Sequence, residues 1–75
     1  MKEEEKGMKS FQVEGEYIKL DQLLKAAEIV DSGGQAKIFI NAGIVAVNGE
    51  VVYQRGKKIY PGDEVTVDHQ QIKIT

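Results

Sequence analysis

A few basic side chains of this sequence occupy positions from which they could contact a polyanion. Lys37 is the only charged residue between Asp31 and Glu50, and it follows the pair Gly33-Gly34 closely. If these glycines begin a helix, the positive end of the helix dipole and the exposed N–H groups favour an anion there. Lys37 therefore predicts a phosphate contact, and the alternative that it only solvates the helix stays open.

A second basic group, Arg55, Lys57 and Lys58, lies within four consecutive positions. Gly56 would let the backbone of this loop approach a ligand closely. Tyr53 and Tyr60 flank the loop, and their rings could stack on a base or cover the small core. The loop predicts further phosphate contacts, with surface solvation again as the alternative.

Gly33 and Gly34 disfavour the helix that they begin, by roughly 1 kcal/mol each relative to alanine. Some other requirement must therefore favour glycine at these positions. One interpretation is that a neighbouring helix passes so close that any side chain would clash. The other is that the open backbone receives a phosphate, and the two interpretations are compatible.

Few side chains of this sequence could support catalysis. His69 is the only histidine and there is no cysteine, so neither a Ser-His-Asp arrangement nor a thiolate nucleophile is available. Asp63, Glu64 and Asp68 are close in sequence, but alternation along a strand does not pair them for acid–base work. Gly33-Gly34 is far short of a phosphate-loop or dinucleotide fingerprint. We expect no enzymatic activity and no catalytic residue, cofactor or metal site.

Length and composition indicate one small globular domain. The chain has 75 residues, of which 41% are hydrophobic and 29% are charged. Without cysteine it has no disulfide framework. The charged start, residues 1–7, has no apolar run behind it, so we expect neither a signal peptide nor a membrane anchor. These features predict a cytoplasmic protein that contacts no membrane, and we expect a monomer.

The overall charge argues against indiscriminate polyanion binding. The formal net charge is −2 and the isoelectric point is near 5.3, whereas general nucleic-acid binders are usually basic. The excess of acidic groups lies in residues 1–16, which hold three lysines and five glutamates. The rest of the chain is neutral, so a local basic patch remains compatible with the acidic total.

Two helices follow a polar start. Residues 1–10 lack apolar periodicity and predict a mobile tail, and residues 11–14 alternate like a short strand. The apolar stripe of a first helix falls at Leu20, Leu23, Leu24 and Ala27, with Asp21 among the residues on the solvent side.

The second helix has recognisable start and stop signals. Ser32 and Gln35 have the spacing of a capping box. We expect the helix to run to about Asn41 and to end at Gly43 in a left-handed conformation. Its buried side would be made by Ala36, Phe39 and Ile40.

The remaining sequence predicts hairpins. Asn48-Gly49 separates two alternating β-branched runs, which indicates a type I′ turn. Residues 61–63 form a second turn before a strand at 65–67, and a turn at 68–70 leads to a last strand at 71–74. The expected architecture is α+β, with an αα-hairpin packed on a small antiparallel sheet of three to five short strands.

Four segments of the chain together resemble the S4 RNA-binding domain. They are Ile18–Leu24, Ser32–Lys37, Gly43–Glu50 and Tyr60–Val65. The resemblance covers about residues 17–67 and is closest to the short, stand-alone bacterial branch of YbcJ- and YaaA-like proteins. It implies an S4-like (αL) domain over residues 11–75 that docks on structured RNA, either rRNA or tRNA, in a ribosome- or translation-associated role.

The resemblance also implies an RNA-binding face on the two helix starts, the hairpin and the basic loop. Its residues would be Lys19, Ser32, Gly33, Gln35, Lys37, Asn41, Asn48, Arg55, Lys57 and Lys58. S4 domains usually carry two or three basic residues on the second helix, whereas this chain has only Lys37. That difference implies weak binding alone, or binding completed by a ribosomal or assembly protein.

Two other functions compete with RNA binding. A β-grasp sulfur carrier shares the Val-Asn-Gly-Glu hairpin, but carriers need a C-terminal Gly-Gly, and the sequence ends Ile74-Thr75. We therefore expect no carrier chemistry. A protein-interaction module that docks on a ribosomal or assembly protein without RNA contact stays open, because the acidic total and the weakly charged second helix suit such a surface.

Overall fold

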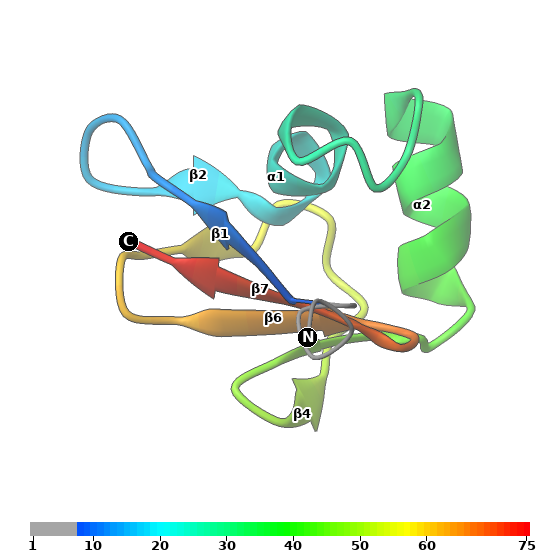
Figure 1. Cartoon of the computed structure of the whole chain (residues 1–75). Helices are drawn as coiled ribbons and strands as arrows, with labels where there is room; N and C mark the ends of the chain where they lie inside the picture. Colours follow the sequence, from blue (N-terminus) through cyan, green and yellow to red (C-terminus); the bar gives the residue numbers. More distant parts are fainter. Residues whose placement is uncertain (1–7) are drawn as a thin grey trace.

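Two helices cover one face of a five-stranded sheet, and a two-stranded sheet lies beside the first helix (Figure 1). The computed structural model describes residues 8–75. Its elements, in chain order, are β1 Met8–Phe11, β2 Ile18–Lys19, α1 Leu20–Ala26, α2 Gly33–Asn41, β3 Val45–Val47, β4 Glu50–Val51, β5 Lys58–Ile59, β6 Glu64–Val67 and β7 Gln70–Ile74. The α+β architecture with an αα-hairpin is confirmed.

The large sheet is mixed and not purely antiparallel. Its strand order is β1-β7-β6-β3-β4, and β2 and β5 form the small sheet. The pairs β3–β4, β3–β6 and β6–β7 are antiparallel, as expected for hairpins and meanders. β1 and β7, however, are parallel. Two adjacent parallel strands need a long connection, and here nearly the whole domain lies between β1 and β7 in the sequence.

The start of the described chain forms a strand, β1, where a mobile tail was predicted. The expectation of a mobile segment over residues 1–10 is wrong for residues 8–10, which belong to β1, and residues 1–7 lie outside the described part of the chain. The strand expected at 11–14 ends at Phe11. Lys9 also donates from Nζ to the carbonyl oxygen of Ala27 at 3.2 Å, at the end of α1. β1 was not predicted because its pairing partner, β7, lies at the other end of the chain.

The core lies between the helices and the inner face of the large sheet. Leu20, Leu23 and Leu24 of α1 are fully buried, and so are Ala36 and Ile40 of α2. Every second residue of β3, β6 and β7 points into the same core, at Val45, Val47, Val65, Val67, Ile72 and Ile74. The period-two burial leaves the opposite sheet face uncovered by either helix.

The predicted N-cap and turns are confirmed, whereas the return bond of the predicted capping box goes to the residue before the N-cap. Ser32 Oγ accepts a hydrogen bond from the N–H of Gln35 at 3.2 Å, and Gln35 Oε1 accepts one from the N–H of Asp31 at 2.7 Å. Gly43 ends α2 with a φ of +78°. Asn48 and Gly49 both have positive φ, +52° and +89°, as a type I′ turn requires. Across residues 8–75, no helix is both long and apolar enough to cross a bilayer.

Candidate nucleic-acid interface

The basic loop closes the start of α1. The N–H of Leu20 donates to the carbonyl oxygen of Lys57 at 2.9 Å, and the N–H of Asp21 donates to that of Arg55 at 3.1 Å. The first N–H groups of a helix have no partner within the helix, so these carbonyls satisfy two of them. The loop is thereby fixed against α1, although the two segments are far apart in the sequence.

A pairing of two short strands brings a further lysine to the same place. In the β2–β5 ladder, Lys19 lies directly opposite Lys58, and Ile18 opposite Ile59. Like charges opposite each other on a ladder are unfavourable for folding. The positive end of the α1 dipole adds to this charge, since Lys19 immediately precedes the helix.

We call Lys19, Arg55, Lys57 and Lys58 the basic cluster. Lys57 is half-buried and the other three are exposed. Among the described residues, a contact of 3.8 Å joins His69 Nε2 to Asp68 Oδ1, and it includes no member of the cluster. Among residues 8–75, no carboxylate forms an ion pair with any of these four basic groups, so the cluster favours an external anion.

Two aromatic rings border the basic cluster. The ammonium group of Lys58 lies 4.9 Å from the ring centroid of Tyr17, which is a cation–π contact. The Tyr17 ring in turn packs on Tyr60, with centroids 5.8 Å apart and an interplanar angle of 52°. The rings are 36% and 46% exposed, respectively. Tyr60 was anticipated beside the basic loop, whereas Tyr17 was missed; its position two residues before Lys19 was the available signal.

The start of α2 is open. A Cβ added to Gly33 would meet no atom within 4 Å, and one added to Gly34 would meet only Ser32 Oγ, at 3.9 Å. The interpretation that a neighbouring helix excludes side chains here is therefore wrong. No hydrogen bond of the described residues uses the N–H of Gly33 or Gly34, so an anion could reach both groups.

The exposed face of α2 carries Lys37 and Asn41, as expected. It also carries Ile38, which is 66% exposed and which sequence reasoning missed. At the far end of this helix, Tyr53 packs on Gly43: a Cβ on that glycine would lie 3.3 Å from the Tyr53 hydroxyl oxygen. The segment from Tyr53 to Lys57 thus runs from the end of α2 to the start of α1.

Two of the anticipated site residues are engaged elsewhere. The side-chain oxygen of Gln35 accepts the N–H of Asp31 and is occupied by helix capping. The side chain of Asn48 donates to Asp63 Oδ1 at 3.0 Å and accepts from the N–H of Glu64 at 2.9 Å. Asn48 therefore ties the β3–β4 turn to the turn before β6, and we leave its side chain out of the proposed binding face.

The carboxylate of Asp21 lies partly inside the protein. One of its oxygens, Oδ1, is buried and has no hydrogen-bond partner among the described residues. The expectation that Asp21 faces solvent is therefore wrong for this atom. A negative charge in the first turn of α1 is favoured by the helix dipole, which compensates in part for the missing partner.

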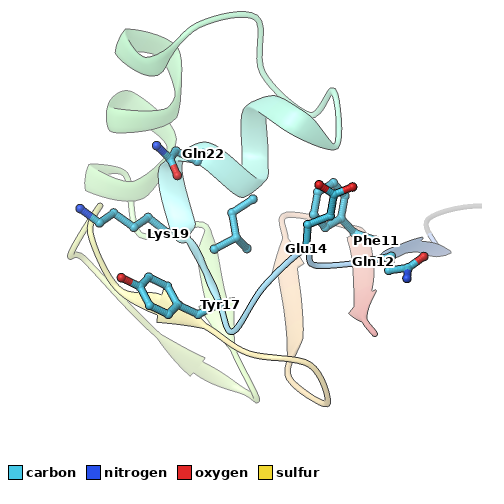
Figure 2. Close-up of a pocket in the computed structure, with 7 residues that line it drawn as sticks. Phe11, Gln12, Glu14, Tyr17, Lys19 and Gln22 are labelled. Carbon is cyan, nitrogen blue, oxygen red and sulfur yellow. The ribbon is translucent and has the colours of Figure 1, made fainter.

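A groove of about 610 Å³ adjoins the basic cluster. Figure 2 shows the residues that line it, which are Phe11, Gln12, Glu14, Tyr17, Ile18, Lys19 and Gln22. Lys19 belongs to both the cluster and the groove. The site thus combines a positively charged surface with a polar hollow that has aromatic side chains in its lining.

Three comparisons relate this chain to known proteins. A family model described as S4 domain matches residues 11–75. The "Probable ribosome maturation protein RlbA" of Bacillus subtilis (strain 168) is 43% identical over 56 residues, which cover 75% of this chain and 79% of that protein. A crystal structure of a pseudouridylate synthase is similar with a TM-score of 0.63 and 25% identity. That similarity covers 68% of this chain and 22% of the synthase chain, so the chain corresponds to only a small part of the enzyme.

Proposed function

Because this chain belongs to the S4 domain family, we propose that it binds structured RNA, either rRNA or tRNA, without catalysing a reaction, and that it acts in ribosome maturation. Family membership and the similarity to a ribosome maturation protein support an RNA-binding or ribosome-associated role. The similarity to the synthase covers a small part of that enzyme and gives no support to enzymatic activity here.

The observation that carries the proposal is the basic cluster at the start of α1. Its backbone is held by hydrogen bonds from Leu20 and Asp21 to the loop and by the β2–β5 pairing. Because these contacts order the backbone of the cluster before any ligand arrives, little backbone entropy is lost on binding. Each phosphate neutralised by the cluster releases counter-ions from the RNA, which drives association at low salt.

The second part of the proposed RNA face is the open start and exposed side of α2. Ser32 orders the first turn, and the unoccupied N–H groups of Gly33 and Gly34 can donate to a phosphate. Lys37 and Asn41 lie further along the helix and are exposed. A single cation on this helix limits the electrostatic contribution, which fits a weak binder or one assisted by a ribosomal or assembly protein.

One observation favours the docking of a protein instead. Ile38 and Tyr53 are large hydrophobic side chains that are 66% and 63% exposed, and they lie on or beside α2. Exposed aliphatic and aromatic side chains near a polar rim are typical of protein contacts. In that alternative, the chain would bind a ribosomal or assembly protein and make no direct contact with RNA.

A titration of fluorescent rRNA fragments at several salt concentrations tests the proposal. The double variant Lys57→Ala with Lys58→Ala should bind more weakly, and the slope of log K against log salt should fall by about 0.7 to 0.9 for each phosphate that is no longer neutralised. Lys73→Ala is the control for the loss of one lysine elsewhere, since Lys73 is exposed on β7 outside the basic cluster. Equal binding and equal slopes for parent, double variant and control would contradict direct RNA binding and favour protein docking.

A further inference from the structure

The groove beside the basic cluster has two walls that are held independently. One wall follows β1, where the N–H of Val13 donates to the carbonyl oxygen of Thr75 at 3.0 Å and the N–H of Thr75 donates to that of Phe11 at 2.9 Å. The other wall leads into α1 and is held through the β2–β5 pairing and the bond from Leu20 to Lys57. Both walls are therefore in place before a ligand binds.

The two walls differ in charge. Figure 2 shows Glu14 on one side of the groove and Lys19 and Gln22 on the other. Lys19 continues into the basic cluster, so a phosphate is favoured at that side. A phosphate is disfavoured near Glu14, where a group that donates hydrogen bonds is favoured. The groove thus suits a ligand with an anionic end and a donor end.

We propose that the groove receives one unpaired guanine nucleotide of the bound RNA, an inference that rests on the function proposed above. The phosphate of this nucleotide would lie at Lys19, in line with the backbone that crosses the basic cluster. The base would enter the groove and direct its donor edge toward Glu14. A volume of about 610 Å³ is large enough for one nucleotide and lies within the range of roughly 300 to 1,000 Å³ typical of small-ligand sites.

Glu14 is the residue that distinguishes guanine from the other bases. An ionised carboxylate has two acceptor oxygens and no donor. Guanine presents two adjacent donors on its Watson–Crick edge, the ring N–H and the exocyclic amino group. Adenine and cytosine place an acceptor beside their amino group, and uracil flanks its single N–H with two carbonyl oxygens. Only guanine can satisfy both carboxylate oxygens without facing one of them with an acceptor.

The rings of the groove supply affinity that does not depend on base identity. Phe11 is half-buried and Tyr17 is 36% exposed, so both can contact a planar base. Stacking on aromatic side chains tolerates any base because every base has a π face. Tyr17 also holds Lys58 over its ring, which links the groove to the basic cluster. Stacking therefore contributes to binding of any base, and Glu14 contributes the preference.

Hairpins with a common stem and a single bulged G, A, C or U, together with an unbulged stem, test this inference by fluorescence anisotropy. We expect the bulged-G hairpin to bind about 5- to 20-fold more tightly than the bulged-A hairpin. Glu14→Gln should abolish this preference, since an amide presents a donor where guanine also presents donors. Glu16→Gln is the matched control: it removes the same charge two residues away, from a side chain outside the groove lining, and should keep the preference.

The outcomes separate this inference from general RNA binding. Equal affinity of the parent for all four bulges, or equal effects of Glu14→Gln and Glu16→Gln on every hairpin, would overturn the guanine site. If Lys57→Ala with Lys58→Ala still weakened binding in that case, the general RNA function would stand. Failure of the parent to bind any hairpin would overturn the guanine site, and failure to bind the rRNA fragments as well would overturn both proposals.

A second measurement uses the unmodified protein. Guanosine monophosphate should shift the NMR signals of the Phe11 and Tyr17 rings more than adenosine monophosphate does. Equal shifts would also contradict the inference.

Discussion

The backbone N–H of Asp21 donates to the carbonyl oxygen of Arg55 at 3.1 Å, and this bond joins the start of α1 to the basic loop. It satisfies a helix N–H group that would otherwise be free. It also places the cations of the loop beside Lys19. The same hydrogen bond therefore caps the helix and helps to assemble the proposed RNA face.

The two asparagines named as candidate site residues should behave differently when replaced. Asn48→Ala removes the hydrogen bonds to Asp63 and Glu64. It also places alanine at a φ of +52°, a left-handed conformation that asparagine tolerates better. We expect a loss of about 1 to 3 kcal/mol in the free energy of unfolding. RNA affinity at a temperature where the variant is folded should be unchanged. Urea denaturation and anisotropy titration measure the two quantities.

Asn41→Ala is the matched control for that substitution. Asn41 is exposed at the end of α2, so stability should change by no more than about 0.5 kcal/mol, whereas RNA affinity should fall. A variant pair in which Asn48→Ala lowered the affinity and Asn41→Ala did not would place the hairpin, and not α2, on the RNA.

Gly34→Ala should stabilise the protein and weaken its RNA binding. The added methyl group meets only Ser32 Oγ, at 3.9 Å, and alanine favours the helix by up to about 1 kcal/mol. The same methyl group would obstruct a phosphate at the N–H groups of the first turn. Thermal melting and titration with RNA check both effects. A stabilised variant with undiminished affinity would show that no phosphate binds at this helix start.

Deletion of residues 1–10 should destabilise the domain. The deletion removes β1 up to Ser10, its pairing with β7 and the bond from Lys9 to Ala27. Because each such hydrogen bond contributes roughly 0.5 to 1.5 kcal/mol, we expect a loss of about 2 kcal/mol or more. A deletion of residues 1–7 retains β1 and is the control. Equal melting temperatures for the two deletions would mean that β1 contributes nothing to stability.

Leu24→Ala should lower the free energy of unfolding by about 2 to 5 kcal/mol, because Leu24 is fully buried between α1 and the sheet. Its effect on RNA binding should follow the folded fraction alone. Ile38→Ala is the control, since Ile38 is 66% exposed and its truncation should cost at most about 0.5 kcal/mol. Chemical denaturation followed by circular dichroism distinguishes these outcomes.

Local physical chemistry determined much of the fold from the sequence. The spacing of Leu20, Leu23 and Leu24 predicted α1, and Ser32 with Gln35 predicted the start of α2. Asn48-Gly49 predicted the type I′ turn. In each case the signal depends on residues within one or two turns of each other, so dihedral preference and side-chain periodicity are sufficient. The order of such signals along the chain also made the S4 resemblance visible.

Tertiary structure alone decided β1 and the residues that make up the proposed binding face. Lys9 and Ser10 show no pattern because their strand is specified by β7, at the other end of the chain. Contacts with residues distant in sequence place Tyr17 at the proposed site and engage the side chain of Asn48 elsewhere. Such contacts depend on which side chains and strand edges lie next to each other once the core has formed. Local propensity carries no information about that pairing, which is why the sequence predicted the elements more completely than the site that they form.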